Sequence, residues 1–225
     1  MPGAGLDGLH LVEVPFVPEV RLHLAQDPTV WWARMEAQAG KKLPPPFWAS
    51  AWAGGRAVAR YILDHPTAVA GRRVLDLAAG SGLVAIAAAK AGAAAVTAND
   101  IDPYAVAAIT LNARANGVHI TPSHADLLDA DGADADIVLA GDAFYTRPMT
   151  RRMLAFLERA AARRTQVLVG DPVRGHLPTN LWHTVTSYQM PPSDAFADSH
   201  LTQINVLRPQ RATDNRDRSP RIAQA

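Results

Sequence analysis

The chain contains a glycine-rich turn between an apolar strand and a helix, a pattern that suits the binding of a nucleotide-like ligand. The segment VLDLAAGSGL, residues 74–83, holds Gly80 and Gly82 in this turn. Glycine lets a ligand approach the backbone closely, and the first N–H groups of a helix are free to bind it. With Ala85, the two glycines also match the G-x-G-x-x-A pattern of dinucleotide-binding turns. The turn alone therefore leaves NAD and S-adenosylmethionine (SAM) as alternatives.

Two carboxylates near this turn favour SAM. Asp76 lies upstream of the glycines, where the chain leaves the strand. An anion there would repel the phosphates of NAD but suits the amino acid and the sulfonium of SAM. Asp100 ends the next predicted strand, and a carboxylate at that strand end can accept both ribose hydroxyls. A loop-capping role is the alternative for Asp76.

Three further residues complete the predicted cofactor site. Asp126 follows a short third strand, where it either binds an adenine amino group or caps a turn. Ile101 adjoins the ribose-binding carboxylate in the sequence. Trp52 is predicted to share a helix face with Trp48, so the two can pack on the core and line the mouth of the cofactor pocket.

Asp142 and Tyr145 are the candidate catalytic residues, in the segment GDAFY at the end of the fourth predicted strand. Ligands of open parallel sheets bind outside the carboxyl ends of the strands, so this segment should face the transferred methyl group. Asp142 can orient a cationic amine, and Tyr145 offers an aromatic wall and a hydroxyl. Methyl transfer is an in-line displacement that depends mainly on positioning. The alternative is a structural strand-end aspartate beside core aromatic residues.

Alternating strand and helix signals must position these residues. Parallel strands are expected at 72–78, 94–100, 119–126, 135–142 and 165–171, with helices at 83–91, 103–116 and 147–163. A further helix is expected over 50–64, with Ser50 as its N-cap. Two final strands, at 183–190 and 201–208, suggest an antiparallel hairpin at one edge. The predicted fold class is α/β, a Rossmann-like seven-stranded class I SAM-dependent methyltransferase sheet with helices on both faces.

Three regions are expected along the chain. Residues 1–47 are predicted to form an irregular N-terminal cap and linker, with one or two short helices before the triple proline in KKLPPPF. Residues 48–208 form the predicted methyltransferase domain. Residues 209–225 are polar and are predicted to be a disordered tail.

Composition excludes several other functions. The 225 residues include no cysteine, which excludes disulfides, thiol nucleophiles and thiolate metal sites. A formal net charge of +1 predicts no strong field, so nucleic acid is not an expected partner. The histidines show no metal-ligand spacing, and no secretory signal or membrane-spanning run is recognised. A cytoplasmic enzyme without a metal or membrane partner is expected.

The motifs together resemble those of the electron transfer flavoprotein β-subunit lysine methyltransferases. The matching segments, of which the D-x-x-Y element is the most specific, are PPFWASAWAGGRAVARYILDHP, VLDLAAGSGLVAIAAAKAGA, ANDIDPYAVAAITLNA, LAGDAFY and RTQVLVGDP. This resemblance implies SAM as the cofactor and a protein lysine, that of the flavoprotein β-subunit, as the substrate. It places Asp76, Gly80, Asp100 and Trp52 at the cofactor, and Asp142 and Tyr145 at the lysine. The chain departs from many relatives at two positions, with Ala78 in place of glycine and Ala53 in place of proline.

Three other functions remain as alternatives. Methyltransferases that modify a ribosomal protein or a small molecule share this core, although their fourth-strand motif commonly opens with Asn followed by Ile or Leu. An NAD-dependent oxidoreductase is disfavoured because no Tyr-x-x-x-Lys pattern or histidine partner is recognised. A non-catalytic SAM-binding protein is disfavoured by the intact D-x-x-Y element.

Overall fold

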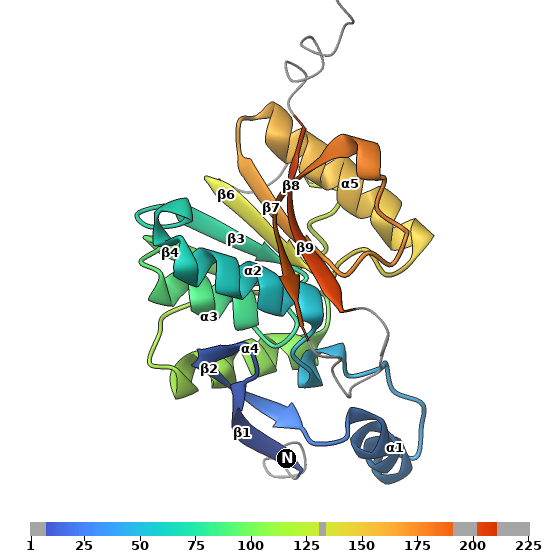
Figure 1. The fold of residues 1–225 in the computed structure, drawn as a ribbon. Helices are drawn as coiled ribbons and strands as arrows, with labels where there is room; N and C mark the ends of the chain where they lie inside the picture. Colours follow the sequence, from blue (N-terminus) through green and yellow to red (C-terminus); the bar gives the residue numbers. More distant parts are fainter. Residues whose placement is uncertain (1–7, 131–133, 191–201, 211–225) are drawn as a thin grey trace, which may run out of the picture.

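The computed structural model describes residues 8–130, 134–190 and 202–210, and its centre is a seven-stranded sheet (Figure 1). The strand order is β5-β4-β3-β6-β7-β9-β8. The parallel strands are β3 (Arg73–Leu77), β4 (Ala95–Asn99), β5 (Thr121–Ser123), β6 (Ile137–Gly141) and β7 (Gln166–Asp171). β8 (Trp182–Gln189) and β9 (Gln203–Pro209) form the predicted antiparallel hairpin, with β9 between β7 and β8. The predicted fold class is confirmed.

Helices cover both faces of the sheet (Figure 1). α2 (Ala53–Asp64), α3 (Leu83–Lys90) and α4 (Pro103–Ala115) pack on one face, and α5 (Arg147–Ala162) packs on the other. Successive side chains of a strand point to opposite faces. In β3, Val74 therefore packs with α2 and α3, whereas its neighbour Leu75 packs with Phe156 of α5. The sheet therefore has a separate apolar core on each of its faces.

The N-terminal region is more regular than predicted. β1 (Leu9–Val14) and β2 (Val17–Ala25) pair as an antiparallel hairpin, and α1 (Pro28–Ala39) follows. The prediction of an irregular segment was wrong here, because prolines within the stretch disguise the strands. Pro18 lies between Val17 and Arg21, where the strand register shifts. Proline has no backbone N–H, and at this unpaired position no hydrogen bond of the ladder is lost. Buried Val14, Val20 and Leu22 join the hairpin to the core beneath α3 and α4.

The start of α2 also differs from the prediction. The helix begins at Ala53, its N-cap residue is Trp52, and no side chain of that residue caps it. Ser50 is buried in the preceding link, and its hydroxyl has no hydrogen-bond partner among the described residues. Trp48 lies in the short 3-10 helix η1 (Phe47–Ala49), so the two tryptophans do not share a helix face. The first turn of α2 takes its hydrogen-bond acceptor from Asp142 instead.

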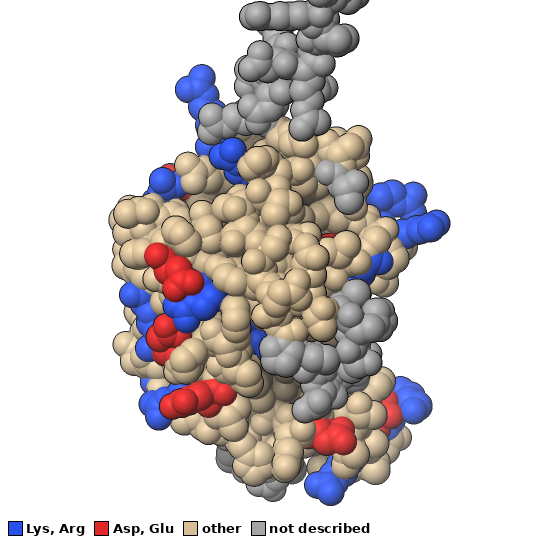
Figure 2. Space-filling view, in the orientation of Figure 1, with Lys and Arg blue, Asp and Glu red and all other residues tan. Residues whose placement is uncertain are grey.

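Two further 3-10 turns, η2 (Pro66–Ala68) and η3 (Thr179–Leu181), connect larger elements. Figure 2 shows charged side chains of both signs scattered in small groups over one face of the molecule. Within the described ranges, no helix is long and apolar enough to cross a membrane. Residues 211–225, most of the predicted tail, lie outside the described residues.

Candidate active site

A pocket of about 580 Å³ opens at the carboxyl ends of β3, β4 and β6. Its lining includes seven of the nine predicted site residues, namely Trp52, Gly80, Asp100, Ile101, Asp126, Asp142 and Tyr145. Apolar surface is supplied by residues that sequence reasoning did not assign to the site, including Pro44, Pro45, Phe47, Leu127, Met149 and Met153. The tertiary fold thus gathers loops that follow three adjacent strands into one cavity, as expected for an open parallel sheet.

Asp100 is fixed at the end of β4 with its carboxylate at the pocket. Oδ2 accepts a hydrogen bond from the backbone N–H of Gly80 at 2.9 Å, and Oδ1 accepts one from that of Asp102 at 3.0 Å. Burial raises the pKa of this carboxyl, and these two donors counteract the rise. The glycine-rich turn and the carboxylate therefore hold each other in place, as a preformed hydrogen-bond acceptor requires.

Asp76 and Gly82 support the turn from behind and do not line the pocket. Asp76 is 1% exposed, and its Oδ2 accepts a hydrogen bond from the backbone N–H of Ala85 at 2.9 Å, in the first turn of α3. Burial raises its pKa to about 8. Gly82 has a φ of 81° and packs on Ile109, so a side chain there would be both strained and crowded.

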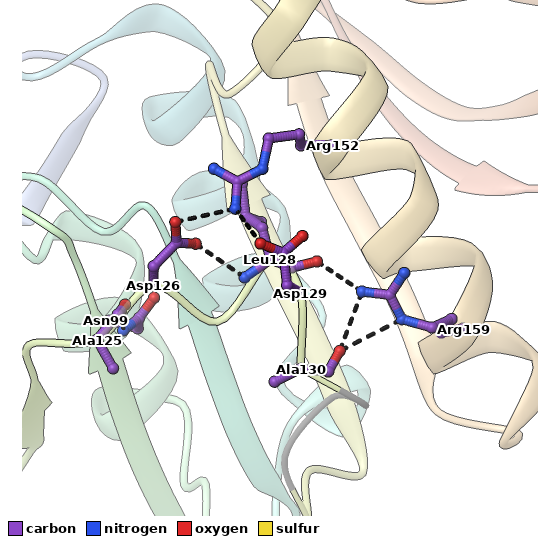
Figure 3. Close-up of polar contacts among 8 residues, drawn as sticks. All are labelled: Asn99, Ala125, Asp126, Leu128, Asp129, Ala130, Arg152 and Arg159. Carbon is purple, nitrogen blue, oxygen red and sulfur yellow. Dashed lines mark hydrogen bonds and ion pairs between the residues drawn. The ribbon is translucent and has the colours of Figure 1, made fainter.

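Asp126 lines the pocket from the loop after β5 (Figure 3). Its Oδ1 accepts a hydrogen bond from the backbone N–H of Leu128 at 3.1 Å, which makes it a turn-capping aspartate as well as a lining residue. Arg152 of α5 bridges Asp126, at 2.9 Å, and Asp129, at 2.8 Å. This pairing lowers the pKa of Asp126. The side chains of Arg152 and Asp126 are nearly half exposed and that of Asp129 is mostly exposed, so the bridge orients the loop more than it stabilises the fold.

Asp142 has the most constrained environment in the pocket. It follows β6 with a φ of 58°, a left-handed conformation that aspartate tolerates better than most residues. Its side chain is 5% exposed. Oδ2 accepts the backbone N–H of Gly54 in the first turn of α2, and Oδ1 forms an ion pair with Arg174. Burial raises the pKa of Asp142, while Arg174, Gly54 and the nearby Arg56 oppose that rise.

Glycines at matched positions bring α2 this close to the strand ends. A Cβ added to Gly141 would lie 2.5 Å from the Cα of Gly55, and one added to Gly54 would lie 2.7 Å from the backbone N of Asp142. Backbone therefore packs directly on backbone, which no residue with a side chain allows without movement. This contact delivers the free N–H groups at the start of α2 to the carboxylate of Asp142.

Aromatic rings surround the mouth of the pocket. The ring of Phe47 lies 5.8 Å from that of Tyr145 and 5.9 Å from that of Trp52. The indole of Trp52 donates a hydrogen bond to the carbonyl of Phe47 at 2.7 Å. Tyr145 is 44% exposed, so it stands at the opening, while Trp48 is buried against Trp31. The predicted aromatic wall therefore exists, with Phe47 as a member that the sequence did not single out.

Arg174 is the main charged residue that sequence reasoning missed. It follows β7 in the segment GDPVRG and reaches the pocket through the ion pair with Asp142. The preceding Gly170-Asp171-Pro172 turn lies at the same rim of the sheet, which was the available signal. Among the described residues, no group of three or more histidine, aspartate or glutamate side chains is placed to hold a metal ion.

Comparisons with known proteins match the chain to methyltransferases. Residues 61–141 match the family model of the ribosomal protein L11 methyltransferase (PrmA), which covers the cofactor half of the sheet. The chain is 37% identical to the electron transfer flavoprotein beta subunit lysine methyltransferase of Homo sapiens, over 84% of this chain and 74% of that protein. It is 36% identical to the protein of the same name from Danio rerio, over 85% and 76% of the two chains.

A solved structure adds support for the fold alone. The precorrin 8w decarboxylase of Methanobacterium thermoautotrophicum superposes with a TM-score of 0.52 at 14% identity, over 69% of this chain and 90% of that one. Such a distant likeness carries no information on the substrate. The sequence relatives span both the cofactor half and the strands beyond it, including the D-x-x-Y segment. The chain therefore belongs to the family of electron transfer flavoprotein beta subunit lysine methyltransferases, which are protein-lysine methyltransferases.

Proposed function

We propose that this protein transfers a methyl group from SAM to a lysine of the electron transfer flavoprotein β-subunit. The observation that carries the proposal is the lining of one pocket by Asp100 on the cofactor side and by Asp142 and Tyr145 on the acceptor side. The named substrate of the vertebrate relatives supports the choice of acceptor protein.

The residues of the pocket suit SAM. Asp100, held by two backbone donors, can accept the ribose hydroxyls, and Asp126 is available to the adenine amino group. Ile101 and Leu127 offer apolar surface for the adenine ring between them. Gly80 presents backbone without a side chain where the amino-acid part of the cofactor would pass. We assign Trp52 to the same wall, and we assign Asp76 and Gly82 to holding the turn that makes these contacts.

The acceptor half of the pocket suits a lysine side chain. A lysine entering past the exposed ring of Tyr145 would meet aromatic faces, which attract a cationic amine. Asp142 lies behind this opening and can orient the amine in line with the methyl group. SAM supplies a methyl group on a positively charged sulfur. The amine must lose its proton to solvent, and its nitrogen then bonds to the methyl carbon as the carbon–sulfur bond breaks, releasing S-adenosylhomocysteine.

A ribosomal protein is the second candidate substrate, because the family model over residues 61–141 is that of the ribosomal protein L11 methyltransferase. That match ends at Gly141, before Asp142 and Tyr145, so it concerns the cofactor half of the sheet and not the acceptor side. The flavoprotein β-subunit is therefore the better-supported acceptor.

The deciding experiment incubates the purified protein with radiolabelled SAM and each candidate substrate, then with lysate of the host. We expect label on lysine of the β-subunit and none on the ribosomal protein. Label confined to the ribosomal protein would overturn the choice of substrate. Calorimetry with SAM, S-adenosylhomocysteine and NAD tests the cofactor, and tight binding of NAD without binding of SAM would overturn the whole proposal.

A further inference from the structure

Arg174 is built into the acceptor side of the pocket. Its Nη1 pairs with Oδ1 of Asp142, and the two side chains are 15% and 5% exposed. The turn that presents it is unusual, because Val173 adopts a φ of 60°, which β-branched residues rarely do. The backbone N–H of Val173 donates to Oδ2 of Asp171 at 2.8 Å, which holds the turn in this shape. Backbone strain that is maintained beside a pocket often has a functional reason, so this turn points to a role for the side chain of Arg174.

A carboxylate alone would be a poor partner for a nucleophilic amine. An anion within a few ångströms stabilises the ammonium form, which has no lone pair to attack the methyl carbon. A cation at the same place has the opposite effect. Asp142 must therefore position the lysine without holding its proton, and a neighbouring positive charge can reconcile these two demands.

We propose that Arg174 is a further residue of the active site, whose charge keeps Asp142 ionised and favours the neutral, nucleophilic form of the acceptor amine. This inference rests on the proposed function, since it takes the acceptor to be a lysine beside Asp142. Each carboxylate oxygen can accept more than one hydrogen bond. The N–H of the acceptor amine can therefore donate to Asp142 while the ion pair with Arg174 stays in place.

The other charged groups around Asp142 do not replace Arg174. From α2, Arg56 lies near enough to favour the ionised carboxylate, but it is 3% exposed and its Nε and Nη2 have no hydrogen-bond partner among the described residues. From β7, the buried Asp171 adds negative charge. Asp100 adds more from the cofactor side, close enough to raise the pKa of Tyr145. Removing Arg174 would leave the buried carboxyls of Asp142 and Asp171 with Arg56 near the first and His176 near the second.

The test is the pH dependence of methyl transfer by the wild-type enzyme and by Arg174→Gln and Arg174→Lys. The substrate is the purified flavoprotein β-subunit, with SAM saturating at every pH. The rate rises with pH as the bound amine loses its proton, and this rise is the limb of the pH profile that the test follows. We expect Arg174→Gln to move this limb upward by about one pH unit or more, as loss of a neighbouring charge does. Below both limbs the variant is then about tenfold slower or more, and the two rates converge at high pH.

Arg174→Lys keeps the charge and should return the limb toward its wild-type position. Arg151 is an exposed arginine on α5 that does not line the pocket. Arg151→Gln also removes one positive charge and should leave the pH profile unchanged. A melting temperature and a SAM affinity are measured for each variant, and Arg174→Lys decides the test if Arg174→Gln fails to fold. A drop in rate that is uniform across pH, or a limb that does not move, overturns this inference alone. A wild-type enzyme that methylates no lysine overturns the proposed function and this inference with it.

Discussion

Replacing Asp142 by asparagine separates its structural role from its proposed catalytic role. Asparagine keeps the size, tolerates the left-handed backbone, and still offers an oxygen to the N–H of Gly54. It removes the negative charge that faces Arg174. Loss of the ion pair between Asp142 and the partly buried Arg174 should cost about 1–3 kcal/mol of folding stability. Asp142→Ala should cost more, because it also removes a helix cap, worth about 1 kcal/mol, and places alanine at a positive φ.

The assay combines three measurements on each variant, namely thermal unfolding, calorimetric SAM affinity and the initial rate of methyl transfer. For Asp142→Asn we expect a folded protein with nearly unchanged SAM affinity and a turnover that is lower by about 10²-fold or more. Asp136→Asn is a matched control, because Asp136 immediately precedes the same strand and pairs with Arg73 at 2.8 Å on the surface. That control should keep its turnover.

Two results would refute this reasoning. A stable Asp142→Asn enzyme that binds SAM and works at the wild-type rate would exclude the catalytic role. A variant that loses stability and SAM binding together would instead identify Asp142 as a structural residue that closes α2 onto the sheet.

Three further predictions concern the cofactor side and the packing. Asp100→Ala should weaken SAM binding by about 1–3 kcal/mol, because the ribose hydroxyls lose their acceptor, and calorimetry that finds unchanged affinity would contradict the ribose assignment. The buried carboxyl of Asp76, with a pKa near 8, stays protonated in the folded state while it ionises in the unfolded state. Wild-type stability should therefore fall as the pH rises from about 4 to about 8. The melting temperature of Asp76→Asn relative to that of the wild type should rise between pH 5 and pH 8. A constant difference between the two melting temperatures would contradict the raised pKa of Asp76. Gly141→Ala should destabilise the protein by about 1–3 kcal/mol through overpacking, whereas Gly55→Ala, whose Cβ would lie 3.8 Å from its nearest neighbour, should be tolerated in chemical denaturation.

Much of the fold followed from the sequence, because its determinants are local. Runs of five residues in β3, β4 and β6, each followed by a helix with a recognisable start, define βαβ units, and such units close into a parallel sheet in few ways. Asp102 illustrates the local rule, since its side chain caps α4 by accepting the N–H of Tyr104 at 2.8 Å. The β1–β2 hairpin was missed because β2 contains Pro18 and the connection carries no tight-turn signal.

The candidate site could be predicted only in part. The glycine turn, Asp100 and Asp142 were identifiable because the carboxyl ends of parallel strands meet at one edge of a sheet. That rule places residues at the edge but does not say which way each side chain turns. It could not reveal that Asp76 points beneath the turn toward Ala85, or that Phe47 joins the aromatic wall from outside the sheet.

The sequence by itself determined which residue types gather at the pocket, while only the tertiary structure decided what each one touches. The state of Asp142 is the clearest case, because its carboxylate is set by Gly54, 88 positions away, and by Arg174, 32 positions away. Neither partner is related to it by helix or strand periodicity. The contact with Gly54 depends on backbone packing between α2 and β6, which glycines permit, and the contact with Arg174 depends on the pairing of β6 with β7. Only the packed fold brings about both.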